Sequence, residues 1–96
     1  MKEGSSWPAL PGAEIVERGV SDLERRVESA EALLVSIGAP RLRRLGVAVE
    51  TPLPAPEHRL YRLLQGEHGN AAHSRYNALI RRLVSFERAA VRLPHA

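Results

Sequence analysis

The stretch AHSRYNALIRRLVSFERAAVRL, residues 72–93, decides the fold of this 96-residue chain. Its apolar residues recur at alternating steps of four and three: Ala72, Tyr76, Leu79, Leu83, Phe86, Ala90 and Leu93. An earlier stretch, residues 16–37, keeps the same spacing: Val16, Val20, Leu23, Val27, Ala30, Leu34 and Ile37. Residues spaced in this way lie on one side of an α-helix. Each stretch therefore predicts a helix that buries an apolar seam against another helix.

Glycine and proline divide the rest of the chain into shorter elements. Gly38 follows the first seam, and Pro94 stops the last helix. Three prolines at alternate positions favour an extended connector over residues 47–56. We expect four helices, at residues 13–37, 40–45, 57–65 and 71–93.

The predicted fold is all-α. It is a three-helix bundle of a long N-terminal helix, a short helix and a C-terminal helix, with an additional short helical segment and the proline-rich connector. We expect one domain over residues 13–93, a flexible tail at residues 1–12 and a second tail at residues 94–96. Ile80, Val84 and Val91 widen the apolar arc of the last helix, which predicts that this helix is the central element.

Composition narrows the class of protein. Hydrophobic residues make up 44% of the chain, which suits one small core, and there is no cysteine to form a disulfide or a thiolate metal site. No apolar run approaches the roughly 20 residues that cross a bilayer, and the first residues contain no apolar secretory segment. We therefore expect a cytoplasmic protein that does not contact membranes.

Charge is distributed unevenly along the chain. Residues 1–38 contain four basic and seven acidic residues, a net charge of −3, whereas residues 39–96 contain ten basic and four acidic residues, a net charge of +6. On the first helix the acids fall along one edge of the seam, as Glu24 does, and on the last helix arginines such as Arg82 fall along the opposite edge. Facing edges of this kind predict that the first and last helices run parallel.

The apolar residues exceed what a chain of this length is expected to cover. We expect the seam to mediate interaction, through Val20, Leu23, Val27, Leu34, Tyr76, Leu79, Leu83 and Phe86. Self-association as a homodimer, or contact with another protein, is the predicted non-catalytic function. Burial of the same side chains against the short helices of one chain is the alternative.

A row of arginines on the last helix suggests a second function. Arg81, Arg88 and Arg92 share the face opposite the seam, as a surface that binds the phosphates of a nucleic acid requires. A solvated helix face that keeps the protein soluble is the alternative explanation.

The segment RLLQGEH, residues 62–68, raises a third possibility. Its spacing of Arg62 and His68 is similar to the Arg-to-His motif of the prokaryotic helical ribonucleases called HEPN. The resemblance implies that His68 acts as a general base in RNA cleavage and that Arg62 stabilises the developing phosphate charge. Our first prediction remains a protein without catalytic residues, bound metal or cofactor. A zinc site is not expected because His68 and His73 flank a turn instead of lying one helical turn apart.

Overall fold

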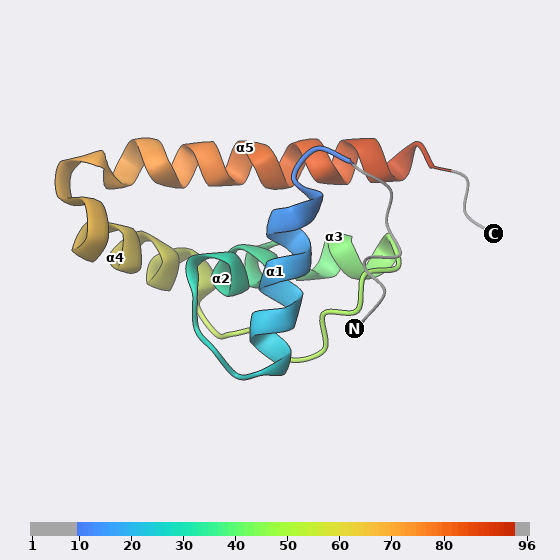
Figure 1. Ribbon diagram of the computed structural model, residues 1–96, viewed down its shortest axis with the longest axis horizontal. Coiled ribbons are helices and arrows are strands. Elements are labelled where there is room, and N and C mark those ends of the chain that lie inside the picture. The colour runs from blue at the N-terminus through green and yellow to red at the C-terminus, as the bar shows by residue number, and fades with distance from the viewer. Residues whose placement is uncertain (1–9, 94–96) are drawn as a thin grey trace.

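The computed structural model describes residues 10–93 and shows them as a set of packed helices (Figure 1). In chain order these are α1 (Ala13–Glu24), α2 (Ala30–Ile37), α3 (Ala39–Arg44), α4 (Pro56–His68), the 3-10 helix η1 (Gly69–Ala71) and α5 (Ala72–Val91). No strand occurs among these residues, so the all-α prediction is confirmed. None of the described helices is both long and apolar enough to cross a membrane. Residues 1–9 and 94–96 lie outside the described part of the chain, and with them Trp7, which the sequence suggests as the anchor of the N-terminal tail on the bundle.

The prediction of one long helix over residues 13–37 is wrong. The chain turns at residues 25–29, where Arg26 adopts a left-handed backbone conformation with φ of 60°, and α2 then packs against α1. Gly19 permits this packing, because a Cβ there would collide with the carbonyl oxygen of Glu31 and lie 2.7 Å from a methyl carbon of Val35. The seam therefore serves two helices, which share one core.

The centre of the fold is α2, not the last helix as its wide apolar arc suggested. Residues 32–35 of α2 are completely buried, and the helix contacts α1, α4, α5 and α3. The reason lies in the run ALLV, which makes this short helix apolar on all sides. In contrast, α5 extends along one side of the molecule and leaves its outer face open (Figure 1).

The first and last helices do not run parallel as predicted. Figure 1 shows α1 beginning beside α5 and running away from it at a steep angle, so the two helices meet near the N-terminal end of α1. There Gly12 forms a left-handed turn so close to α5 that a Cβ would lie 2.7 Å from the Arg82 carbonyl oxygen. Arg82 pairs with Glu14 at 2.7 Å, not with the acid edge that includes Glu24. Residues 10–12, which the sequence assigned to the tail, thus form this turn.

The hairpin of α4 and α5 closes the other side of the core. Its helices are joined by η1, and the rings of Tyr61 and Tyr76 pack edge to face with centroids 5.8 Å apart. Burial raises the pKa of Tyr76, and the charge of Glu57 adds to the rise, so its phenol stays neutral. Helix α4 continues through Gly66 to His68, three residues beyond its predicted end.

The proline-rich connector lies over the core without regular secondary structure. It bends at Thr51 and at residues 54–55, where Ala55 is left-handed, and α4 begins at Pro56, which the sequence assigned to the connector. Val47 and Val49 are buried, and the Val49 carbonyl accepts a hydrogen bond from Arg43 Nε at 2.7 Å. Further along, the backbone N–H of Leu53 donates to Ser36 Oγ at 3.0 Å. These bonds fix the connector beside the C-terminal end of α1, where it forms one wall of a groove.

Candidate functional site

The residues of the predicted interaction seam face mainly the core of their own chain. Leu23, Leu34, Leu83 and Phe86 are buried, and Val20, Tyr76 and Leu79 are half-buried. Val27 differs, because 43% of its surface is exposed. Only one other large hydrophobic residue of the described chain is classed as exposed, Val91 at 63%. Each of these two valines lines a groove in the described part of the structure.

The first groove lies where α3 meets the C-terminal half of α5. Its lining residues are Arg41, Val84, Glu87, Arg88, Val91 and Arg92, and its volume is about 520 Å³. We call this surface the basic groove. Three of its six side chains are arginines and two are valines, so it combines an apolar stripe with a positive rim.

Glu87 fixes the floor of the basic groove. Only 7% of this residue is exposed, and its Oε1 accepts a hydrogen bond from Arg41 Nε at 3.0 Å, which links α5 to α3. The close approach depends on Gly38, since a Cβ there would lie 3.0 Å from Glu87 Oε2. Oε2 itself is buried without a hydrogen-bond partner in the described part of the structure. Arg88 and Arg92 form no ion pair with any described residue and remain available at the rim.

The second groove lies between the end of α1, the turn after it and the connector. It has a volume of about 550 Å³, and its lining includes Leu23, Glu24, Val27, Glu28, Glu50 and Leu53. We call this surface the acidic groove. Arg26 also lines it, so three carboxylates stand against one guanidinium.

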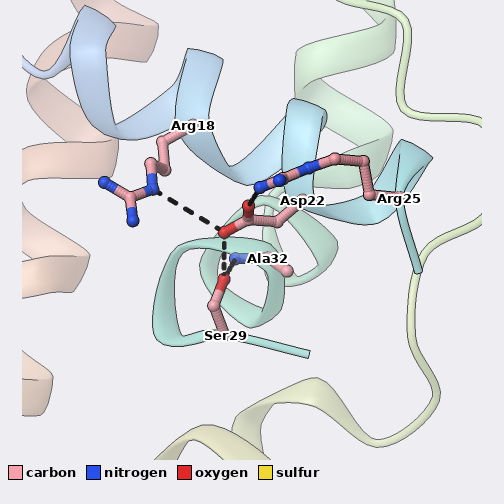
Figure 2. A network of polar contacts seen from close by, with 5 residues as sticks. All are labelled: Arg18, Asp22, Arg25, Ser29 and Ala32. Carbon is pink, nitrogen blue, oxygen red and sulfur yellow. Dashed lines mark hydrogen bonds and ion pairs between the residues drawn. The ribbon is translucent and has the colours of Figure 1, made fainter. Parts of the chain in front are cut away.

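A buried carboxylate holds the turn that carries Arg26 and Val27 (Figure 2). Asp22 is 3% exposed; its Oδ2 accepts from Ser29 Oγ and its Oδ1 from Arg25 Nη2, both at 2.6 Å. Ser29 Oγ in turn accepts from the backbone N–H of Ala32 at 3.0 Å, which caps α2. The hydrogen bond from Ser29 lowers the pKa of Asp22 most; burial opposes the shift, and Arg25 contributes further to it. Asp22 is therefore charged at neutral pH and ties the end of α1 to the start of α2.

A second contact fixes the same turn to α4. The Arg59 guanidinium donates two hydrogen bonds to the Glu28 carboxylate, at 3.1 and 2.6 Å, and these bonds raise the pKa of Arg59. This pairing satisfies Glu28 but leaves Glu24 and Glu50 without an ion-pair partner among the residues described. The free negative charge of the acidic groove thus comes from Glu24 and Glu50.

The predicted arginine row lies on the open face of α5. Arg81, Arg88 and Arg92 are all exposed, and Glu87, the one acid of this helix, is buried. The small residues Ser74, Ala78 and Ser85 are also exposed there. The structure thus brings the three predicted arginines to one surface, two of them also lining the basic groove.

Arg62 and His68 both lie on α4. In a continuous helix a six-residue offset separates two side chains by about 120° around the axis and about 9 Å along it. Arg62 is exposed and His68 is half-buried beside Glu67, whose carboxylate is 3.8 Å from the His68 ring. A single chain therefore places the two residues on different sides of the helix. Residues 10–93 contain no group of three or more His, Asp or Glu side chains arranged to hold a metal ion.

No family model matches the sequence, and no curated protein and no solved structure shows significant similarity to it. Functional inference for this chain therefore depends on its own surfaces. The sequence indicated Arg41 only as part of a basic cluster with Arg43 and Arg44, and it did not single out Glu87 or Glu50; Arg41 and Glu87 line the basic groove and Glu50 lines the acidic groove. The sequence feature that could have indicated the basic groove is the pair Val84 and Val91, which lie seven residues apart and outside the seam.

Proposed function

We propose that this chain is a non-catalytic protein of the cytoplasm that acts by self-association and uses the basic groove as a contact surface. The observation that carries the proposal is the exposure of Val91, 63%, within a groove rimmed by arginines. Val84 lies two helical turns earlier on the same flank of α5 and is half-buried. Together they form an apolar stripe that the chain's own helices leave partly open.

Physical chemistry favours a protein partner for such a surface. Removing apolar area from water stabilises an association by about 25 cal/mol per Å². Arginine is enriched at protein interfaces because its planar guanidinium pairs with carboxylates through two hydrogen bonds. A second copy of the chain is a suitable partner because its residues 1–38 carry a net charge of −3.

Sedimentation equilibrium of the full chain over a range of concentrations tests the proposal. We expect the mass to rise from the monomer value of 10.6 kDa to twice that value as concentration increases. Val91→Asp should weaken the association, because it places a carboxylate in the apolar stripe. Ala78→Asp adds the same charge on the exposed face of α5 outside the groove and should leave the association intact. A wild-type chain that stays monomeric at all concentrations contradicts self-association.

Nucleic-acid binding is a second candidate, favoured by the absence of any exposed acid on α5. In this case Arg81, Arg88 and Arg92 would contact phosphates. Fluorescence anisotropy can measure the binding of a labelled single-stranded RNA and of a labelled DNA duplex. The affinity should fall steeply between 50 and 200 mM salt. A plot of log affinity against log salt concentration should have a negative slope, close in size to the number of phosphate contacts. An unchanged anisotropy at the lower salt concentration would eliminate this candidate.

A further inference from the structure

The two grooves have opposite predominant charges, and each carries an exposed apolar residue. Each contains one of the two large hydrophobic residues classed as exposed in the described chain, Val27 in the acidic groove and Val91 in the basic groove. Their predominant charges are opposite.

We propose that the acidic groove of one copy receives the C-terminal turns of α5 from a second copy, while its own α5 enters the acidic groove of that copy. This inference rests on the proposed self-association and identifies the two surfaces that meet. Val91 would pack against Val27 and Leu53 of the second copy. Arg88 and Arg92 would meet its carboxylates.

The unpaired charges of the two grooves are mainly opposite in sign, although Arg26 also lines the acidic groove. Within residues 10–93, Glu24 and Glu50 are the carboxylates of the acidic groove without an ion-pair partner, since Glu28 is occupied by Arg59. In the basic groove Arg88 and Arg92 are the guanidinium groups that pair with no carboxylate of the described chain, since Arg41 is occupied by Glu87. Opposite charges that meet across an interface fix its register and exclude wrong partners.

Both grooves exist before association. Asp22 and Ser29 hold the turn beside the acidic groove, and the bond between Arg41 and Glu87 holds α3 against α5 beside the basic groove. A surface that is already ordered loses less conformational entropy when it binds, so more of the contact energy remains as affinity.

Size favours reciprocal exchange between two copies over a single contact. A specific protein interface buries about 800 Å² on each partner, and one groove of this size supplies only part of that area. In a two-fold dimer each copy contributes both of its grooves, which doubles the contact and closes the assembly. A single contact per pair would instead leave one groove of each copy free and build an open chain.

Charge reversal on the full chain tests the exchange. Glu24→Arg removes the excess negative charge of the acidic groove, and Arg92→Glu removes the excess positive charge of the basic groove, so each variant alone should raise the dissociation constant of its own dimer by about tenfold or more. An equimolar mixture of the two variants should restore a dimer. In the mixed dimer the residue at position 24 of each copy faces an opposite charge at position 92 of the other copy. The double variant should restore a homodimer for the same reason. Native mass spectrometry identifies the mixed dimer.

Matched controls make the same charge changes outside the grooves. Glu67→Arg lies at the end of α4 and Arg75→Glu at the start of α5, and both positions are exposed. These variants should keep the wild-type dissociation constant, and circular dichroism should show equal helix content in all the proteins.

The outcomes separate this inference from the proposed function. A wild-type dimer that Val91→Asp dissociates but Glu24→Arg leaves intact overturns the exchange and retains self-association through the basic groove. A mixture of the two reversal variants that stays monomeric also overturns the exchange, as does a wild-type mass that grows beyond the dimer with concentration. A wild-type chain that is monomeric at every concentration overturns both.

Discussion

Asp22 and Ser29 lie on opposite sides of the turn between α1 and α2, and Ser29 Oγ donates a hydrogen bond to Asp22 Oδ2 at 2.6 Å. The same Ser29 oxygen caps α2 by accepting from the Ala32 N–H at 3.0 Å. One carboxylate thus supports a cap that starts the central helix. The turn between them carries Arg26 and Val27, so this bond also shapes the acidic groove.

Asp22→Asn should destabilise the fold. The amide keeps the shape of the side chain but replaces charge-assisted hydrogen bonds with weaker ones, which should cost about 1–2 kcal/mol of the free energy of unfolding. Urea denaturation followed by circular dichroism measures the loss. Glu17→Gln is the control, because Glu17 lies on the same helix and forms no hydrogen bond or ion pair within the described chain. Equal stability of both variants would contradict the role assigned to Asp22.

The contribution of Asp22 to the free energy of unfolding should decrease as the pH falls. The hydrogen bond from Ser29 and the charge of Arg25 hold the pKa of Asp22 below its ordinary value in the folded protein. The unfolded chain therefore binds the proton first as the pH falls, and the stabilisation is complete above the ordinary pKa of about 3.9 and lost as the pH falls through the folded value. The difference in unfolding free energy between wild type and Asp22→Asn should be constant from pH 7 to pH 5 and shrink toward pH 2. A difference that grows on acidification would contradict this assignment.

Replacing Gly66 or Gly19 with alanine should change the stability of the protein in opposite directions. Gly66 has open space around its missing Cβ, so Gly66→Ala should stabilise the protein by up to about 1 kcal/mol through helix propensity. Gly19 faces the backbone of α2, so Gly19→Ala should destabilise the protein, because the new methyl group forces α1 and α2 apart. Thermal unfolding of the two variants gives the comparison. A stabilising Gly19→Ala would show that the two helices do not pack as described.

The sequence predicted the existence of the helices better than their arrangement. The seam of residues 72–93 matches α5 because an unbroken apolar face needs only local periodicity. The turn at residues 25–29 was missed because it contains neither glycine nor proline, and the apolar spacing continues across it. Contacts within the folded chain explain why it turns back: Gly19 packs against Glu31, and Asp22 binds Ser29.

The candidate site was predictable only in part for a similar reason. Arg81, Arg88 and Arg92 share a face through helical spacing alone, and the structure keeps them together. In contrast, the proximity of Arg41 to Glu87, or of Glu50 to Glu24, depends on how the connector and α3 cross the core. Contacts between residues far apart in the chain leave no local sequence pattern from which they could be predicted.

The crossing of α1 and α5 predicts which of two acids couples to Arg82. Glu14 lies 2.7 Å from the Arg82 guanidinium, whereas Glu24 is at the far end of α1, so only the first pair should interact. Both partners are exposed, and double-mutant cycles should therefore give a coupling of at most about 1 kcal/mol for Glu14 with Arg82 and none for Glu24 with Arg82. The cycles use charge reversal, with Glu14→Arg or Glu24→Arg combined with Arg82→Glu, and are measured by urea unfolding at low salt on protein dilute enough to be monomeric. Coupling of Glu24 instead of Glu14 would indicate parallel helices and contradict the crossed arrangement.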